Sequence, residues 1–571
     1  MSHQGSVSRQ SKEELDLYEM KNAAAEFYRL NRVPQEIERA LNELLLQQAA
    51  DVHGYLADYF TNLSAPPRIS RLKGKEVYDA SGQLSIEAEV FCIVCNKEKS
   101  MSSAAVSSHL PPMETSLHWK AKSQERVDHV MTAVQWINEQ LNSMLKDQNP
   151  CDQSEIDHIL SSFFMARYLE EKTCSREKLE SYSLSQPEVV VPSPTPIQTK
   201  DKKSADKVKK NNIAEKPFLP AELSEPVLHG SLAIGSLSLA VSKTGAQIQG
   251  IPLYKYIAAL TRREAPTQFH IPVSLVTLLS CGKTSPGKLN LLKEVILIPK
   301  VGQRVKQIIT MTLELQKEMM RIMNTTTKAG ALQAIVSDSG ALTVSSERPE
   351  QPLDLITEAC GNLELTLGTD ICLAVNCAAP EIMDYSKGKY EVATGVLKCP
   401  DELVDMYQSL ICKYPAVVAL IDPFRREDTD QWEKLSKTTG GSCSLISDIT
   451  YKSKASPLPG VSGFILKHVN ETTVSDLICI TSEHKGSVLM GTTCSEPCSD
   501  DSLSDIAVGL GLDYVILGGL SGAQRMLKYN RLISIEEELA QQGMLASKEK
   551  LPPPLLHGKT QEQSAAAERT V

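Results

Sequence analysis

The sequence predicts an α/β protein with three parts: an N-terminal helical segment, an α+β domain and a (βα)8-type barrel. Apolar residues recur at helical spacing before residue 64, and an alternating strand follows a turn signal at Asp79–Gly82. From residue 227 onward, short apolar strands alternate with helical patterns. A chain of 571 residues is long enough for two or three domains plus linkers.

Residues 1–66 are predicted to be helical. Pro34 suits the first turn of one helix, and Asp51 suits the N-cap of the next. Helices this short cannot bury their apolar faces alone, so the segment needs a partner. The apolar positions of the first of these two helices repeat at helical spacing: Ile37, Leu41, Leu44 and Leu45.

The central chain is predicted to hold an α+β domain in two pieces, residues 67–172 and 227–265. Between them, residues 173–226 are rich in Pro, Ser and Lys and poor in apolar side chains. Such a composition cannot offset the entropy of ordering the chain, so it predicts a disordered insertion.

Residues 266–545 are predicted to form the barrel, followed by a polar, disordered tail at 546–571. Short continuous apolar strands separated by helices are typical of a parallel sheet that is covered on both faces. The strands that show this most clearly are Glu294–Ile298, Ile371–Val375, Val417–Ile421 and Gly463–Lys467.

Composition limits the classes of function. The net charge of −10 argues against a nucleic-acid binder, which is usually basic. No run of 18 apolar residues occurs, so no membrane span is expected. The 14 cysteines without a secretory signal favour reduced thiols in a cytoplasmic protein.

Several ordered motifs from Ile69 to Gln542 resemble the enolase family, most closely its sperm-type branch. They are Lys75–Gly82, Gly230–Ala240, Gly250–Tyr254, Asp422-Pro423-Phe424 with Trp432, Asp500–Leu510 and Arg525–Leu539. The resemblance implies the enolase fold and the glycolytic dehydration of 2-phosphoglycerate to phosphoenolpyruvate. It also implies two Mg²⁺ ions, a dimer with itself or with other enolase subunits, and a setting in the sperm flagellum.

Two catalytic positions of the family are retained. The resemblance places Lys467 at the position of the proton-accepting lysine and Glu294 at that of a substrate-side glutamate. A base lysine requires a depressed pKa, and the end of a barrel strand is where barrel active sites lie. The alternatives are a strand-end lysine that reaches solvent and an ordinary carboxylate at the start of a strand.

Other family positions are substituted. The acid position carries Ser339, which cannot donate a proton near neutral pH as a tuned carboxylic acid does. The substrate positions carry Thr284, Thr493 and Ile516. Magnesium prefers carboxylate ligands, but the three metal positions carry Asn376, Ile421 and Ser447.

Asp422 and Asp448 each follow one of the substituted metal positions. Successive side chains of a strand point to opposite faces, so we expect both carboxylates to face away from the pocket unless the register shifts.

The N-terminal segment resembles the dimerisation/docking helix pair of the regulatory subunit of protein kinase A, in which two hairpins together accept an amphipathic helix. The alternative is a helical extension packed on the enolase body. Two functions therefore remain open: an active enolase, or an enolase-fold structural protein that docks to a helical partner or to active enolases.

Overall fold

The computed structural model divides the described chain into two compact units, residues 1–67 with 93–98, and residues 68–92 with 99–571. The described residues are 12–107, 119–184, 227–262, 266–283, 285–326, 335–450, 458–484, 487–493, 497 and 500–546.

The described residues of the first unit form three helices, α1 (Lys12–Leu30), α2 (Val33–Gln47) and α3 (Val52–Asn62). Pro34 lies in the first turn of α2, where its missing N–H costs no hydrogen bond. The Asp51 side chain accepts a hydrogen bond from Gly54 N at 2.9 Å and so caps α3. Both sequence predictions for these helix starts are confirmed.

The α+β region of the second unit consists of a three-stranded sheet and several helices. The strands are β1 (Arg68–Tyr78), β2 (Leu84–Val94) and β3 (Lys97–Ala104), in that spatial order. The helices are α4 (Trp119–Trp136), the π-helix η1 (Ile137–Leu141), α5 (Asn142–Leu145), α6 (Gln153–Leu184), α7 (Leu232–Gln249) and α8 (Leu253–Thr261).

Helix α6 corrects one predicted boundary. It runs to Leu184, so the beginning of the predicted disordered insertion 173–226 is helical. The physical reason is local, because residues 175–180 (Ser-Arg-Glu-Lys-Leu-Glu) are mostly good helix formers and contain neither proline nor glycine. The rest of that predicted insertion, residues 185–226, lies outside the described residues.

The barrel is closed. A nine-stranded sheet runs β15-β14-β13-β12-β11-β7-β5-β4-β6, and β15 also pairs with β4, so β6 lies outside a ring of eight strands. These ring strands are β4 (Val273–Ser280), β5 (Glu294–Pro299), β7 (Ile371–Asn376), β11 (Val417–Ile421), β12 (Ser444–Asp448), β13 (Val461–Leu466), β14 (Ser487–Gly491) and β15 (Tyr514–Gly518).

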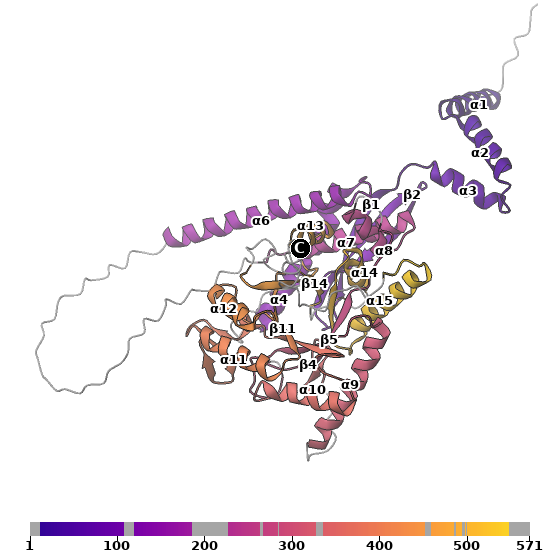
Figure 1. Cartoon of the computed structure of the whole chain (residues 1–571). Coiled ribbons are helices and arrows are strands. Elements are labelled where there is room, and N and C mark those ends of the chain that lie inside the picture. Colours follow the sequence, from indigo (N-terminus) through magenta and orange to yellow (C-terminus); the bar gives the residue numbers. More distant parts are fainter. Residues whose placement is uncertain are drawn as a thin grey trace, which may run out of the picture. The chain divides into compact units, whose positions relative to one another are not determined.

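Helices lie around the outside of the ring (Figure 1). They are α9 (Val305–Thr326), α10 (Glu350–Asn362), α11 (Pro400–Lys413), α12 (Thr429–Thr439), α13 (Val474–Glu483), α14 (Ser502–Gly509) and α15 (Ala523–Gln541). Strand β6 (Leu342–Thr343) and the small sheet of β8 (Met383–Asp384), β9 (Lys389–Ala393) and β10 (Val396–Lys398) complete the unit. The predicted barrel class is confirmed.

One strand departs from the parallel arrangement that the sequence predicted. β5 is antiparallel to both of its neighbours, β4 and β7. No helix is described between β4 and β5, so the chain makes no crossover and returns along the adjacent edge in the opposite direction. A parallel neighbour would have required a crossover connection.

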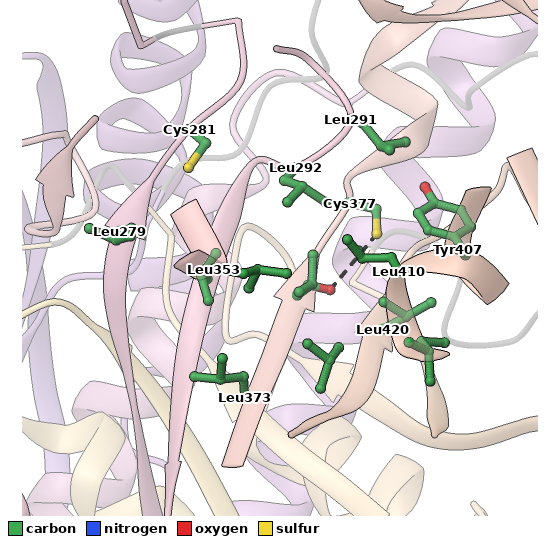
Figure 2. Packing of buried hydrophobic residues seen from close by; sticks show 14 of the residues in the cluster. Leu279, Cys281, Leu291, Leu292, Leu353, Leu373, Cys377, Tyr407, Leu410 and Leu420 are labelled. Carbon is green, nitrogen blue, oxygen red and sulfur yellow. Dashed lines mark hydrogen bonds between the residues drawn. The ribbon is translucent and has the colours of Figure 1, made fainter. Parts of the chain in front are cut away.

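The barrel has an inner and an outer apolar layer. Inside the ring, one cluster includes Leu275, Ile296, Ile421, Ile446 and Ile465. A larger cluster lies between the strands and the outer helices, and Figure 2 shows part of it, including Leu279, Leu353, Leu373, Leu410 and Leu420. Burial of two apolar layers accounts for strands that read as continuous apolar runs.

No helix within the described ranges is long and apolar enough to cross a membrane.

Candidate active site at the barrel mouth

The candidate site lies where neighbouring strands end. Lys467 directly follows β13, Asp448 is the last residue of β12, and Asp422 directly follows β11. These strands are parallel and adjacent, so their carboxyl ends meet at one edge of the barrel, where barrel active sites lie. Three residues far apart in the sequence thereby reach one small region.

Lys467 is held by a carboxylate. Its Nζ donates a hydrogen bond to Asp448 Oδ2 at 2.6 Å, and about a fifth of each side chain is exposed (19% and 21%). Burial alone would lower the pKa of Lys467, but Asp448 and then Asp422 raise that pKa above its ordinary value. Lys467 is therefore a protonated ammonium at neutral pH in this arrangement.

Asp422 is the third charged residue at this edge of the barrel, and it contacts Asp448. Its Oδ1 accepts a hydrogen bond from the Asp448 backbone N–H at 3.0 Å. Burial and the neighbouring Asp448 carboxylate raise the pKa of Asp422 to about 7. Lys467 has the opposite effect on Asp448, because it lowers the pKa of that carboxyl despite its burial.

Strand alternation, from which we expected Asp422 and Asp448 to face away from the pocket, does not describe either carboxylate. Asp422 has a positive φ of 45°, directly after the last residue of β11. The strand alternation therefore ends at Ile421 and does not determine where Asp422 points. Asp448 ends its strand, and its carboxylate contacts the Lys467 ammonium directly.

Glu294 lies on the other side of the barrel mouth. It pairs in register with Asn376 across β5 and β7, and the Asn376 amide donates from Nδ2 to Glu294 Oε2 at 3.0 Å. The preceding residue, Lys293, forms an ion pair with Glu381 at 2.6 Å. Two of the predicted site residues, Glu294 and Asn376, are thus brought together.

The three family metal positions do not fit a pair of magnesium ions. Asn376 offers only a neutral amide, and that amide is bonded to Glu294. Ile421 is 2% exposed and packs in the inner apolar cluster, so it offers no ligand. Ser447 is buried, and its Oγ makes no hydrogen bond to any described residue. Magnesium prefers several hard, usually anionic, oxygen ligands, which these side chains do not supply.

Among the described residues, no group of three or more His, Cys, Asp or Glu side chains could hold a metal ion. Asp448 is not a free replacement for the missing ligands, because its carboxylate is already paired with Lys467 at 2.6 Å.

Of the remaining predicted positions in the described residues, only Thr493 lies near Lys467. Ser339 Oγ forms a 2.9 Å hydrogen bond with Ser337 Oγ, within the loop before β6. Ile516 lies in β15 and packs against the inner apolar cluster. Thr493 lines a cavity together with Lys467. Thr284 lies outside the described residues.

Sequence reasoning missed residues around that cavity. His468 directly follows Lys467, and Asp500 and Lys528 also line the hollow. Burial lowers the pKa of His468 to about 4, so this imidazole is neutral at pH 7. The signal for Lys528 was available, because it lies on the buried stripe of α15 that continues through Leu532 and Leu539 at helical spacing.

This closed barrel, with a lysine at its mouth, is an enolase-type barrel: residues 268–552 match the family described as "Enolase, C-terminal TIM barrel domain". Relatives named "Enolase 4" match almost the whole chain. The protein from Danio rerio is 47% identical over 553 residues, covering 94% of this chain and 95% of the relative. Those from Xenopus laevis and Homo sapiens are each 43% identical, covering 95% and 94% of this chain and 95% and 90% of the relatives. The chain therefore belongs to the enolase family, whose glycolytic members are lyases.

Proposed function

We propose that this enolase-family protein supports glycolysis as a structural and docking subunit, without dehydrating 2-phosphoglycerate at its own barrel mouth. The main observation behind this proposal is that Lys467 is paired with Asp448 and therefore protonated. A lysine that is bonded to Asp448 at 2.6 Å, with its pKa raised, is a poor proton acceptor.

The metal positions support the same proposal. Enolase turnover, as the resemblance implies it, depends on two magnesium ions to stabilise the charge of the intermediate. Ile421 contributes a buried apolar side chain where the resemblance implies a carboxylate. Ile516 contributes a partly buried apolar side chain where the resemblance implies a lysine. The mouth therefore lacks both the anions that hold metal and one of the cations that hold substrate.

The experiment is a direct assay. The protein is purified away from host enolase, and the formation of phosphoenolpyruvate is followed with and without Mg²⁺. We expect no turnover above that of the Lys467→Ala variant. The matched control is Lys437→Ala, which removes a lysine from the exposed face of α12. Turnover that depends on Mg²⁺, is abolished by Lys467→Ala and survives Lys437→Ala would refute the proposal.

A second function, docking through α2 and α3, is favoured by apolar side chains that the first unit leaves exposed. Ile37, Leu41 and Leu45 are 46%, 52% and 72% exposed, and they follow one another at intervals of four residues on α2. Phe60 on α3 is also exposed. Burial of such an apolar stripe against a partner is favourable. A bundle of two hairpins that accepts an amphipathic helix would bury it in this way.

In this proposal the sperm flagellum is the setting, and the partners are enolase subunits and a helical flagellar component. The test compares Leu41→Glu with Glu43→Gln, an alteration on the same helix that removes no apolar side chain. We expect Leu41→Glu to abolish self-association of the N-terminal segment, measured by analytical ultracentrifugation, and to abolish capture of an amphipathic-helix probe. If both variants associate like the wild type, the hairpin is not a docking surface.

A further inference from the structure

Helices α2 and α3, which together we call the docking hairpin, carry two rows of apolar side chains. The members of each row follow one another at intervals of four residues, and all are exposed or half-buried: Ile37, Leu41 and Leu45 on α2, and Val52, Leu56 and Phe60 on α3. Among residues 16–67, only Ala40 is buried. Two short helices with so little core leave both rows available to a partner.

The docking hairpin is strongly acidic. Residues 33–62 contain five carboxylates but only one lysine or arginine. The carboxylates belong to Glu36, Glu38, Glu43, Asp51 and Asp58, and the one basic residue is Arg39. A bundle of two such hairpins would double this excess of negative charge, and the excess favours a positively charged occupant.

One acidic residue of α2 lies directly beside the apolar row of that helix. Glu38 comes three residues before Leu41 and seven before Leu45, and residues at these spacings are neighbours on a helix surface. Arg39 is two residues from Ile37 and therefore lies on another face, where its guanidinium pairs with Glu36 at 3.1 Å. The charge next to the row on α2 is therefore negative.

The opposite edge of this row is acidic as well. Glu36 and Glu43 are seven residues apart, so they share one face of α2, next to Ala40. Both carboxylates lie near α3, because after partial burial it is Glu43 and then Glu36 that raise the pKa of the Tyr59 phenol on that helix. An apolar helix face laid along the row would thus meet carboxylates on both sides.

We propose that the partner of the docking hairpin is a basic amphipathic helix, whose apolar face covers the two rows and whose flanking Lys or Arg side chains meet Glu36, Glu38 and Glu43. This inference rests on the proposed docking function and deepens it by assigning the partner a charge. Helix α1 of this chain does not fit, because it has five acidic side chains and only three basic ones. Charges that flank an apolar contact select a partner of the opposite sign and reject one of the same sign.

The test measures binding of synthetic peptides to the full chain by fluorescence anisotropy. Two peptides of about 18 residues, long enough to span α2, share one leucine face and differ only in a polar face of Lys or of Glu. We expect the Lys peptide to bind at least about tenfold more tightly than the Glu peptide at low ionic strength. The difference should shrink toward about 1 M NaCl, because salt screens exposed charges.

A pair of variants tests the assigned carboxylates. Glu36→Gln combined with Glu38→Gln should weaken binding of the Lys peptide roughly threefold to tenfold at low ionic strength and should not weaken binding of the Glu peptide. The matched control combines Glu364→Gln with Glu537→Gln, which removes two exposed carboxylates from the second unit and should change neither affinity. A third peptide, with Lys on its polar face and Ser in place of Leu, should not bind measurably.

Three results would overturn the inference while docking itself still stands. They are equal binding of the two leucine-faced peptides, tighter binding of the Glu peptide, and equal losses from the hairpin variant and its control. Binding of the Ser-containing peptide as tightly as the Lys peptide would also overturn it, because the apolar rows would then not be the contact. If none of the peptides binds, the docking function fails together with the inference.

Discussion

The wall of the barrel, formed by its strands, and the mouth, at the carboxyl ends of those strands, differ in how far they match the enolase family. The wall has the apolar packing of the family fold, whereas the mouth lacks several side chains that the resemblance implies. The wall keeps continuous buried rows such as Val417–Ile421 in β11, with apolar layers on both faces. At the mouth, the last residue of this row, Ile421, occupies a position where the resemblance implies a metal ligand. The next residue, Asp422, lies beside the ion pair of Lys467 and Asp448. Packing depends on the apolar character of many residues together, whereas site chemistry depends on a few individual side chains. The fold can therefore persist while the site changes.

The largest expected effect tests the wall. Trp432 in α12 is fully buried, donates from Nε1 to Arg425 O at 2.9 Å, and packs edge-on against Phe424. Trp432→Ala should lower the free energy of unfolding by about 3–5 kcal/mol, because it leaves a cavity and an unpaired backbone oxygen. Urea unfolding measures this change.

Tyr78→Ala is the control for that experiment, since this aromatic side chain is 70% exposed at the end of β1. It should change stability by less than about 0.5 kcal/mol. If Trp432→Ala and Tyr78→Ala lowered the free energy of unfolding equally, burial of side chains in the wall would not determine the stability of the barrel.

The next largest effect is expected at Ile421, which lies at the boundary between the wall and the mouth. Ile421→Glu restores the family's carboxylate but inserts a charge into the inner apolar cluster. It should cost about 2–4 kcal/mol, whereas Ile421→Val should cost about 0.5–1.5 kcal/mol. Millimolar Mg²⁺ should not restore the urea midpoint of Ile421→Glu, because Asn376 and Ser447 supply no anionic ligand beside it. Recovery with Mg²⁺ would show that the mouth still holds a metal site.

The barrel strands could be predicted because a buried strand needs only a short run of apolar residues, and β5, β7, β11 and β13 each have one. The cap at Asp51 could also be predicted, because it depends on residues three apart in the chain. The antiparallel direction of β5 was missed, because apolar runs carry no information on strand direction.

The contacts between side chains at the mouth could not be predicted from the sequence. Asp448 ends β12 and Lys467 directly follows β13, and only the pairing of these two strands brings the side chains to 2.6 Å from each other. The direction of Asp422 depends on a positive φ just past the strand, which the identity of the residue does not reveal. Family resemblance predicted which positions belong to the site, but the contacts between them are properties of the tertiary structure.

A smaller effect concerns pH. Folding raises the pKa of Asp422 to about 7, so the folded state holds a proton that the unfolded state releases near pH 4. The stability from this proton is fully present below the unfolded pKa and is lost as pH rises through about 7. Asp422→Asn does not titrate, so its stability relative to wild type should increase by about 1–2 kcal/mol between about pH 5 and about pH 8. Urea midpoints at the two pH values measure the change.

The control for the pH experiment is Asp384→Asn, since hydrogen bonds from Ser386 and then Lys387 lower the pKa of Asp384 to about 2. That variant should show no change relative to wild type over the same window. If Asp422→Asn also shows none, the Asp422 carboxyl is ionised throughout, and the mouth carries more negative charge than the comparison with the wall assumes.

The smallest effect separates loss of the acid from loss of the metal ligands. Ser339→Glu returns a carboxyl group to the family's acid position, in a partly exposed loop where only a hydrogen bond to Ser337 is disturbed. Stability should change by less than about 0.5 kcal/mol, and no phosphoenolpyruvate should form with Mg²⁺. The matched control is Ser339→Gln, which has nearly the same size but cannot donate a proton as a carboxylic acid does. Turnover by Ser339→Glu but not by Ser339→Gln would mean that the acid alone had been limiting. Catalysis would then be compatible with a buried Ile421 and with a Lys467 that is paired with Asp448. The mouth, like the wall, would then match the enolase family in function.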